Sequence, residues 1–151
     1  MRTVVIGGGS WGTAVARLLA RAGHRTTLAC RDPAQAETIG RRHRNPRYLY
    51  DIELPPELDA SPIADTSFDG AELVALAVPS RAFAATVASV ADRLPGDAAL
   101  LSLTKGLDPG DRRRMSEILA EVAPAERIAV LSGPNHAEEV ARDLPTASLD
   151  A

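Results

Sequence analysis

Three glycines near the amino terminus, Gly7, Gly9 and Gly12, have the spacing G-x-G-x-x-G. Residues 3–6 before them form a short β-branched apolar run that is typical of a buried strand, and from Ala14 onward the apolar residues recur at helical spacing. In such a strand–turn–helix unit, the first glycine permits a tight turn and the second lets the backbone approach a pyrophosphate. The third lets the helix pack closely on the strand. The pattern favours a dinucleotide site, with a merely structural glycine turn as the alternative.

A single lysine stands out among the basic residues. Of the 17 Lys and Arg residues only Lys105 is a lysine, and it follows an apolar run at residues 98–103. Lysine is a compact point charge that donates and exchanges protons, whereas arginine is a permanently charged fork. Open α/β sheets bind their ligands at the carboxyl ends of their strands. Lys105 is therefore a candidate for a chemical role that an arginine cannot fill. The alternative is that this lysine is present by chance in an arginine-rich chain and has no special role.

The residue after the second predicted strand bears on the choice of nucleotide. This strand spans residues 25–30, and Arg31 follows it. NAD-binding units usually carry an acid at this strand end, which accepts hydrogen bonds from the adenosine ribose, whereas an arginine suits a ribose 2′-phosphate. The sequence thus favours NADP, or tolerance of NAD and NADP, with an exposed surface arginine as the alternative. Asp32 lies one or two positions beyond the place of the acid that binds the adenosine ribose. It is instead predicted to be a helix N-cap, with Pro33 at the first helical position.

Strands and helices alternate along the rest of the chain, which predicts an α/β fold with a Rossmann-type doubly wound, mainly parallel sheet. One NAD(P)-binding domain is expected over residues 1–151. The clearest later strand is 73–78, an uninterrupted apolar run typical of a parallel strand covered on both faces. The other expected elements are strands at 58–63, 98–103 and 127–131, helices at 34–40, 80–93, 111–122 and 135–142, and one more strand beginning within 144–151.

The composition is that of an ordinary folded domain. Hydrophobic residues make up 45% of the chain and charged residues 25%, and the net charge of −3 does not favour nucleic acid as a partner. No apolar run approaches the roughly 18 residues that a membrane helix needs. One cysteine, Cys30, forms no internal disulfide, and Met1 leads almost directly into a strand, so we expect a cytoplasmic protein. No metal site is expected, because metal-ligand spacing is lacking among the histidines His24, His43 and His136.

A series of short motifs runs in order along the whole chain: Gly7-x-Gly9-Ser10-Trp11-Gly12-Thr13-Ala14, Arg31, Asn45 with Tyr48-Leu49, Val78-Pro79-Ser80, Thr104-Lys105-Gly106, and Ser132-Gly133-Pro134 followed by 137–141. Together these motifs closely resemble the bacterial NAD(P)-dependent glycerol-3-phosphate dehydrogenases. The resemblance implies reversible hydride transfer between a nicotinamide cofactor and the pair glycerol 3-phosphate and dihydroxyacetone phosphate. In the cytoplasm this reaction supplies phospholipid backbones.

The resemblance also implies roles for individual residues. Lys105 would lie near cofactor and substrate together, and Gly133 would border the substrate. The family usually has a small hydroxyl residue two places after that glycine, where this chain has Asn135, whose amide can also form the hydrogen bond. None of these residues is assigned as the catalytic acid or base. The residues expected at the cofactor are Gly7, Gly9, Ser10, Trp11, Gly12, Arg31, Tyr48, Lys105 and Ala137.

Members of the family continue into a C-terminal helical domain that this chain lacks. That domain supplies the lysine proposed as general acid/base and most of the grip on the phosphorylated substrate, and it allows a homodimer. The resemblance therefore implies that residues 1–151 are the cofactor-binding part of such an enzyme. Two alternatives stay open: a stand-alone NADP(H)-binding module without catalysis, and a related dehydrogenase that acts on a hydroxy acid, because fold alone does not fix the substrate.

Overall fold

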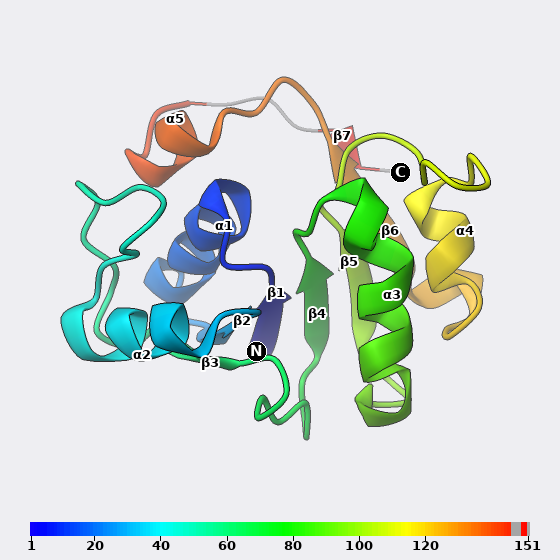
Figure 1. Cartoon of the computed structure of the whole chain (residues 1–151), viewed down its shortest axis with the longest axis horizontal. Coiled ribbons are helices and arrows are strands. Elements are labelled where there is room, and N and C mark those ends of the chain that lie inside the picture. Colours follow the sequence, from blue (N-terminus) through cyan, green and yellow to red (C-terminus); the bar gives the residue numbers. More distant parts are fainter. Residues whose placement is uncertain (146–148, 151) are drawn as a thin grey trace.

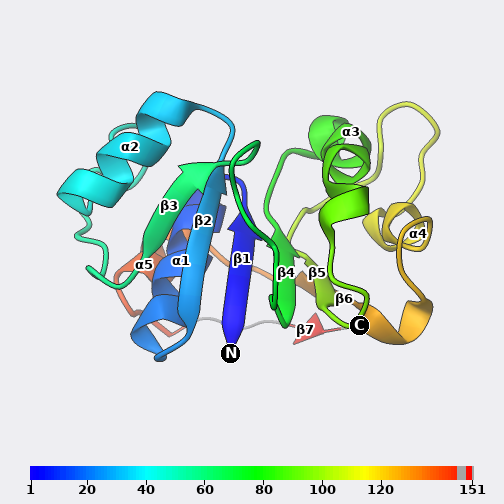
Figure 2. The same cartoon turned by 90° about the horizontal axis from the view of Figure 1, so that it is seen from below.

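The computed structural model describes residues 1–145 and 149–150, and its strands form one sheet (Figures 1 and 2). The strands are β1 (Arg2–Ile6), β2 (Arg25–Cys30), β3 (Asp59–Pro62), β4 (Leu73–Leu76), β5 (Ala99–Ser102), β6 (Ile128–Ser132) and β7 (Leu149–Asp150). Their order across the sheet is β3-β2-β1-β4-β5-β6-β7. Strands β1 to β6 pair in parallel, and β7 is antiparallel to β6. The order of the first six strands is that of a doubly wound nucleotide-binding sheet, which confirms the expected fold class.

Helices cover both faces of this sheet. They are α1 (Ser10–Arg21), α2 (Pro33–Arg42), α3 (Ser80–Val90), α4 (Met115–Leu119) and α5 (Ala137–Ala141), with short 3-10 turns at Ala91–Arg93 and Ala125–Arg127. Helices α1 and α2 lie on one face and α3 and α4 on the other, while α5 packs against α1 rather than on the sheet (Figure 1). Among the described residues no helix has the length and apolar character that crossing a bilayer requires.

The two sides of the core follow from the alternation of side chains along each strand. Val4 and Ile6 of β1 pack into the cluster that contains Phe83 of α3, whereas Val5 between them packs into the cluster that contains Val15 of α1. Successive residues of a strand point to opposite faces, so a strand buried on both sides must be apolar throughout. This is why an uninterrupted apolar run correctly predicted a central parallel strand.

Several of the predicted element boundaries are confirmed, whereas some of the predicted elements are longer than the observed ones. Strand β2 has the bounds expected, and Asp32 is the N-cap of α2, where its carboxylate accepts a hydrogen bond from Ala34 N at 2.9 Å. Strand β4 ends at Leu76, earlier than the apolar run suggested, since the chain already turns toward Pro79 at the start of α3. Helix α3 ends at Val90 and continues only as a 3-10 turn.

The helices expected at 111–122 and 135–142 are wrong in length. The first is α4, only Met115–Leu119, because the carboxylate of Asp108 accepts hydrogen bonds from the backbone N–H groups of Gly110 and Asp111 and folds that stretch into a turn. The second is α5, only Ala137–Ala141. The strand expected within 144–151 is present as β7, and residues 146–148 and 151 lie outside the described part of the chain.

Cys30 ends β2 and is fully buried as a free thiol. Burial, with a smaller effect from the nearby negative charge of Asp32, raises the pKa of the Cys30 thiol from 9.0 to about 11. In the unfolded chain the thiol loses its proton near the ordinary value, while the folded protein keeps it. Between pH 9 and 11 the unfolded state therefore binds fewer protons, so stability falls as the pH rises.

We expect this effect as a difference between the wild type and Cys30→Ala. The free energy of unfolding, measured by denaturant titration at a series of pH values, should fall more steeply in the wild type between pH 9 and 11. Below pH 9 the two curves should run parallel, because the thiol is protonated in both states of the wild type. Parallel curves across the whole range would contradict the prediction.

Candidate functional site

The three glycines of the first turn have different structural tasks. A Cβ on Gly7, which has φ +121°, would lie 2.4 Å from the carbonyl oxygen of Ala77, and a Cβ on Gly12 would lie 1.9 Å from the carbonyl oxygen of Gly7. These two glycines therefore allow the turn and the close approach of α1 to the sheet. A Cβ on Gly9 would have no atom of the described residues within 4 Å. Gly9 faces open space, as a residue that a ligand approaches must do.

The open space at Gly9 lies over the N-terminus of α1. Gly9 is the N-cap of this helix, and no side chain among the described residues caps it. The first backbone N–H groups of a helix have no partner inside the helix, and this end carries the positive pole of its dipole. The first turn contains no acidic residue that would compete for these donors. The geometry therefore suits an anion such as a pyrophosphate, so the residues present fit a dinucleotide.

A cavity of about 420 Å³ opens beside this helix end. Its walls are the segments that follow the carboxyl ends of β1, β4 and β5, together with the start of α5. This is the edge where parallel α/β sheets bind ligands. The lining residues are Gly9, Ser10, Trp11, Ala77, Val78, Pro79, Ser80, Leu103, Thr104, Lys105, Asn135, His136 and Ala137.

Lys105 is held at the edge of the cavity by its neighbour in the sequence. The hydroxyl of buried Thr104 donates to the carbonyl oxygen of Val78 at 2.7 Å, which ties the end of β5 to the segment after β4. The Lys105 side chain is exposed, and its Nζ donates to the carbonyl oxygen of Gly133 at 2.8 Å and to that of Asn135 at 3.5 Å. The fold thus brings together the three residues expected at the substrate.

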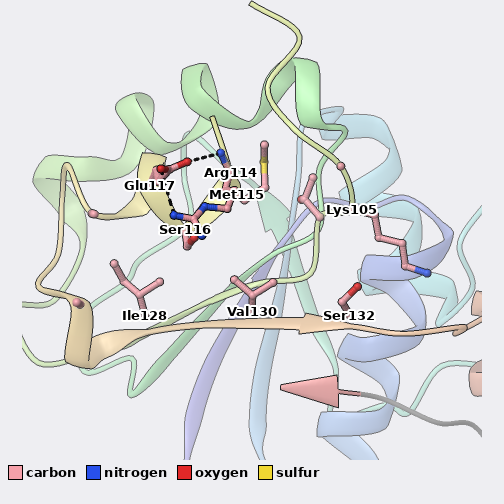
Figure 3. Close-up of a pocket in the computed structure, with 12 residues that line it drawn as sticks. Lys105, Arg114, Met115, Ser116, Glu117, Ile128, Val130 and Ser132 are labelled. Carbon is pink, nitrogen blue, oxygen red and sulfur yellow. Dashed lines mark hydrogen bonds and ion pairs between the residues drawn. The ribbon is translucent and has the colours of Figure 1, made fainter. Parts of the chain in front are cut away.

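A larger cavity of about 620 Å³ lies on the other side of Lys105, between α4 and β6 (Figure 3). Two of its charged groups are paired with each other, since Arg114 forms an exposed ion pair with Glu117 at 3.2 Å. Figure 3 shows that the ammonium of Lys105 points away from this pair. The glycine turn does not line this cavity. The smaller cavity is therefore the better candidate site, although Thr104 and Lys105 belong to both walls.

Four of the residues expected at the cofactor do not line the smaller cavity: Gly7 and Gly12, which belong to the glycine turn itself, and Arg31 and Tyr48. Arg31 is exposed at the tip of β2, and its side chain forms no ion pair or hydrogen bond with any described residue. Tyr48 lies in the loop after α2 and is 43% exposed. Nearby, Arg47 pairs with Asp32 at 2.5 Å. Arg31, the glycine turn and Lys105 follow the carboxyl ends of β2, β1 and β5, so Arg31 and Lys105 lie on opposite sides of the glycine turn along this edge of the sheet.

Helix α5, which begins with Ala137, is too short to hold its position by itself. Val140 and Ala141 pack on Ala14 of α1 in a small apolar cluster. At its end Asp143 forms an ion pair with Arg17 of α1 at 3.0 Å, and the hydrogen bond from Arg17 holds the pKa of Asp143 below its ordinary value. These contacts fix Ala137 at the mouth of the cavity.

Two further residues contact the glycine turn and were given no role from the sequence. Gln35 and Asn45 are buried, and both donate side-chain hydrogen bonds to the carbonyl oxygen of Gly8. Asn45 was noted only as part of a motif. A signal for Gln35 was present, because it lies on the buried stripe of α2 beside Ala36 and Ile39. A polar side chain on such a stripe requires a buried partner.

Comparison with known proteins agrees with this geometry. A family model described as NAD-dependent glycerol-3-phosphate dehydrogenase N-terminus matches residues 2–151. The glycerol-3-phosphate dehydrogenase (NAD(P)+) of Nocardia farcinica is 47% identical over 99% of this chain and 46% of its own length, and that of Parafrankia sp. is 45% identical with the same coverage. A crystal structure of glycerol-3-phosphate dehydrogenase from Coxiella burnetii is 32% identical with a TM-score of 0.88, covering 99% of this chain and 46% of that one. The chain spans about half the length of these relatives.

Proposed function

The chain belongs to the NAD-dependent glycerol-3-phosphate dehydrogenase family, whose N-terminal part it matches, and we propose that the protein containing it interconverts glycerol 3-phosphate and dihydroxyacetone phosphate with NAD(P)(H). The observation that carries the proposal is the cavity in which the N-terminus of α1 meets Lys105. It combines donors for a pyrophosphate with a cation for a second ligand. Lys105 also contacts the backbone of Gly133 and Asn135, the residues expected at the substrate.

The residues of this chain would bind and orient the reactants. When bound, the nicotinamide supplies or accepts the hydride. The N-terminus of α1 would hold the pyrophosphate, which fixes the cofactor beside the segments after β4 and β5. An ammonium has three donors, so Lys105 can keep its hydrogen bond to Gly133 and direct another N–H at an oxygen of the substrate. That contact stabilises negative charge on the oxygen that gains or loses a proton.

We also propose a preference for NADPH over NADH, supported by Arg31. Its side chain is exposed at the end of β2, where an arginine suits a ribose 2′-phosphate, and it forms no ion pair with a described residue. Arg31→Glu removes a charge-assisted hydrogen bond and adds repulsion, so the affinity for NADPH should fall about 10- to 100-fold while that for NADH changes little.

The measurement is titration with each cofactor, followed by the fluorescence of the single tryptophan, Trp11, which lines the cavity. Arg25→Glu is a matched control, since Arg25 is exposed at the opposite end of the same strand. It should leave both affinities unchanged. Equal losses for NADPH and NADH in the Arg31 variant would exclude the role at the 2′-phosphate.

The proposed reaction is tested by oxidation of NADPH in the presence of dihydroxyacetone phosphate, followed by absorbance. We expect residues 1–151 alone to bind NADPH but to reduce this substrate negligibly, because more than half of the length of the relatives has no counterpart in it. A protein that carries this domain with the remaining length should be active. NADPH binding without turnover in that longer protein would contradict the proposed reaction and favour NADPH binding without catalysis.

The setting of the reaction is part of the same proposal. We place it in the cytoplasm, where the buried thiol of Cys30 stays reduced, and in the supply of glycerol 3-phosphate for phospholipids. A homodimer formed through residues beyond this chain stays a prediction. So does the lack of affinity for nucleic acid, which rests on the net charge of −3.

A further inference from the structure

The carbonyl group of Gly8, inside the glycine turn, is held by two buried amides. Gln35 Nε2 donates to its oxygen at 2.6 Å and Asn45 Nδ2 at 3.0 Å. A trans peptide is planar, so its C=O and the following N–H point in opposite directions, and no cis peptide occurs among the described residues. Because the Gly8 carbonyl points into the protein, the N–H of Gly9 is directed away from the interior. The two amides thus set the direction of the first donor at the helix end.

Asn45 also holds the helix that follows the turn. The second hydrogen of its Nδ2 is donated to the hydroxyl of Thr13 in α1 at 2.8 Å. Asn45 is 1% exposed and Thr13 is fully buried, so water does not compete for this hydrogen bond. Both hydrogens of one amide nitrogen are therefore used, one on the turn and one on the first turns of α1. The side chain fixes the angle between these two parts of the phosphate site.

The oxygen of the same amide holds a different part of the site. Asn45 Oδ1 accepts hydrogen bonds from the backbone N–H groups of Arg47 at 3.0 Å and Tyr48 at 3.2 Å. Arg47 in turn pairs with Asp32, the residue that follows Arg31. One buried side chain thus joins the glycine turn to the segment that carries Tyr48 and, through Arg47, to the tip of β2.

We propose that Asn45 is a positioning residue for the dinucleotide, which directs the N–H of Gly9 toward the pyrophosphate and keeps the Tyr48 segment in register with it. This inference rests on the proposed function, because it presupposes a dinucleotide at the glycine turn. Asn45 acts through the backbone of its neighbours and lines no part of the cavity itself. Gln35 is its partner at the Gly8 carbonyl.

The test is Asn45→Asp, which keeps the shape of the side chain and the oxygen that accepts from Arg47 and Tyr48. It replaces the donor that faces the Gly8 carbonyl by a second acceptor, so the turn is repelled instead of held. The affinities for NADPH and NADH should both fall, by the same factor of about tenfold or more, since the pyrophosphate is common to both. Lowering the pH should recover affinity as the introduced carboxyl gains a proton and becomes a donor again.

Thr26→Val is the matched control for the loss of a buried hydrogen bond. The Thr26 hydroxyl lies 2.8 Å from that of Thr3 at the amino ends of β1 and β2, away from the candidate site. This variant should lower the free energy of unfolding and leave both cofactor affinities unchanged. If Asn45→Asp behaves in the same way, with the affinity of the folded protein within about twofold of wild type at every pH, the proposal is overturned.

Gln35→Met keeps the test decisive if Asn45→Asp does not fold. It removes one of the two donors to the Gly8 carbonyl and one donor to Asn45 Oδ1 but keeps the donors of Asn45 itself, so we expect a smaller loss of affinity in the same direction for both cofactors. Unchanged affinity in a folded Gln35→Met protein would overturn the proposal. Failure of the proposed function has a different signature, because the wild-type chain would then bind neither NADPH nor NADH.

Discussion

Gly9→Val is expected to remove detectable NADPH binding, a loss of about 100-fold or more, and to leave the fold intact. The backbone of Gly9, with φ −75° and ψ −179°, is extended, a conformation that valine adopts readily. Its Cβ would enter open space, so nothing in the folded protein clashes with it. The branches of the new side chain would instead occupy the volume in front of the helix end that a pyrophosphate must fill. Trp11 fluorescence reports binding, and circular dichroism with denaturant titration reports the fold.

Gly12→Val is the contrasting variant in the same turn. A Cβ there would lie 1.9 Å from the carbonyl oxygen of Gly7, so the helix could no longer approach the strand and the domain should unfold. The two variants separate a glycine needed by the ligand from a glycine needed by the fold. If Gly9→Val binds NADPH with wild-type affinity, the dinucleotide site lies elsewhere and the proposed function loses its main support.

Lys105→Ala, made in a protein that carries this domain with the remaining length of its relatives, should lower kcat about 100- to 10,000-fold. The affinity for NADPH should change far less, since the pyrophosphate is held by backbone groups that this change leaves in place. The physical reason is that Lys105 is the lining residue with a formal charge that reaches the Gly133 and Asn135 backbone, where the substrate is expected. Steady-state kinetics together with direct titration of NADPH separates the two effects.

Two comparisons make this result specific. Lys105→Arg keeps the charge but replaces a compact ammonium by a larger planar fork, so it should recover only part of the activity. Arg25→Ala removes an exposed cation far from the cavity and should leave kcat unchanged. A parallel loss of kcat and cofactor affinity in Lys105→Ala would show that Lys105 serves the cofactor and not the reacting atoms.

The sequence by itself determined the fold class and the local elements of the site. The glycine spacing specified the turn, because a Cβ at Gly7 or Gly12 would meet backbone atoms whatever the rest of the chain does. Asp32 specified the start of α2 through a hydrogen bond two residues away. Apolar runs specified central strands, since a strand buried on both faces excludes polar residues. The turn at Asp108 also depends on a local hydrogen bond, from Gly110 N to the Asp108 carboxylate. The helical spacing of the apolar residues that follow masked this signal, so the helix at 111–122 was predicted too long.

Only the tertiary structure decided which distant residues meet. Gly8 and Asn45 are 37 residues apart, and Lys105 and Gly133 are 28 apart. Such partners are set by the order of strands in the sheet and the path of the connections between them, which no local propensity encodes. For the same reason the sequence named Arg31 and Lys105 as parts of one site but could not place them on opposite sides of the glycine turn. The residue types specified the chemistry of this site, and the packing of the sheet specified its shape.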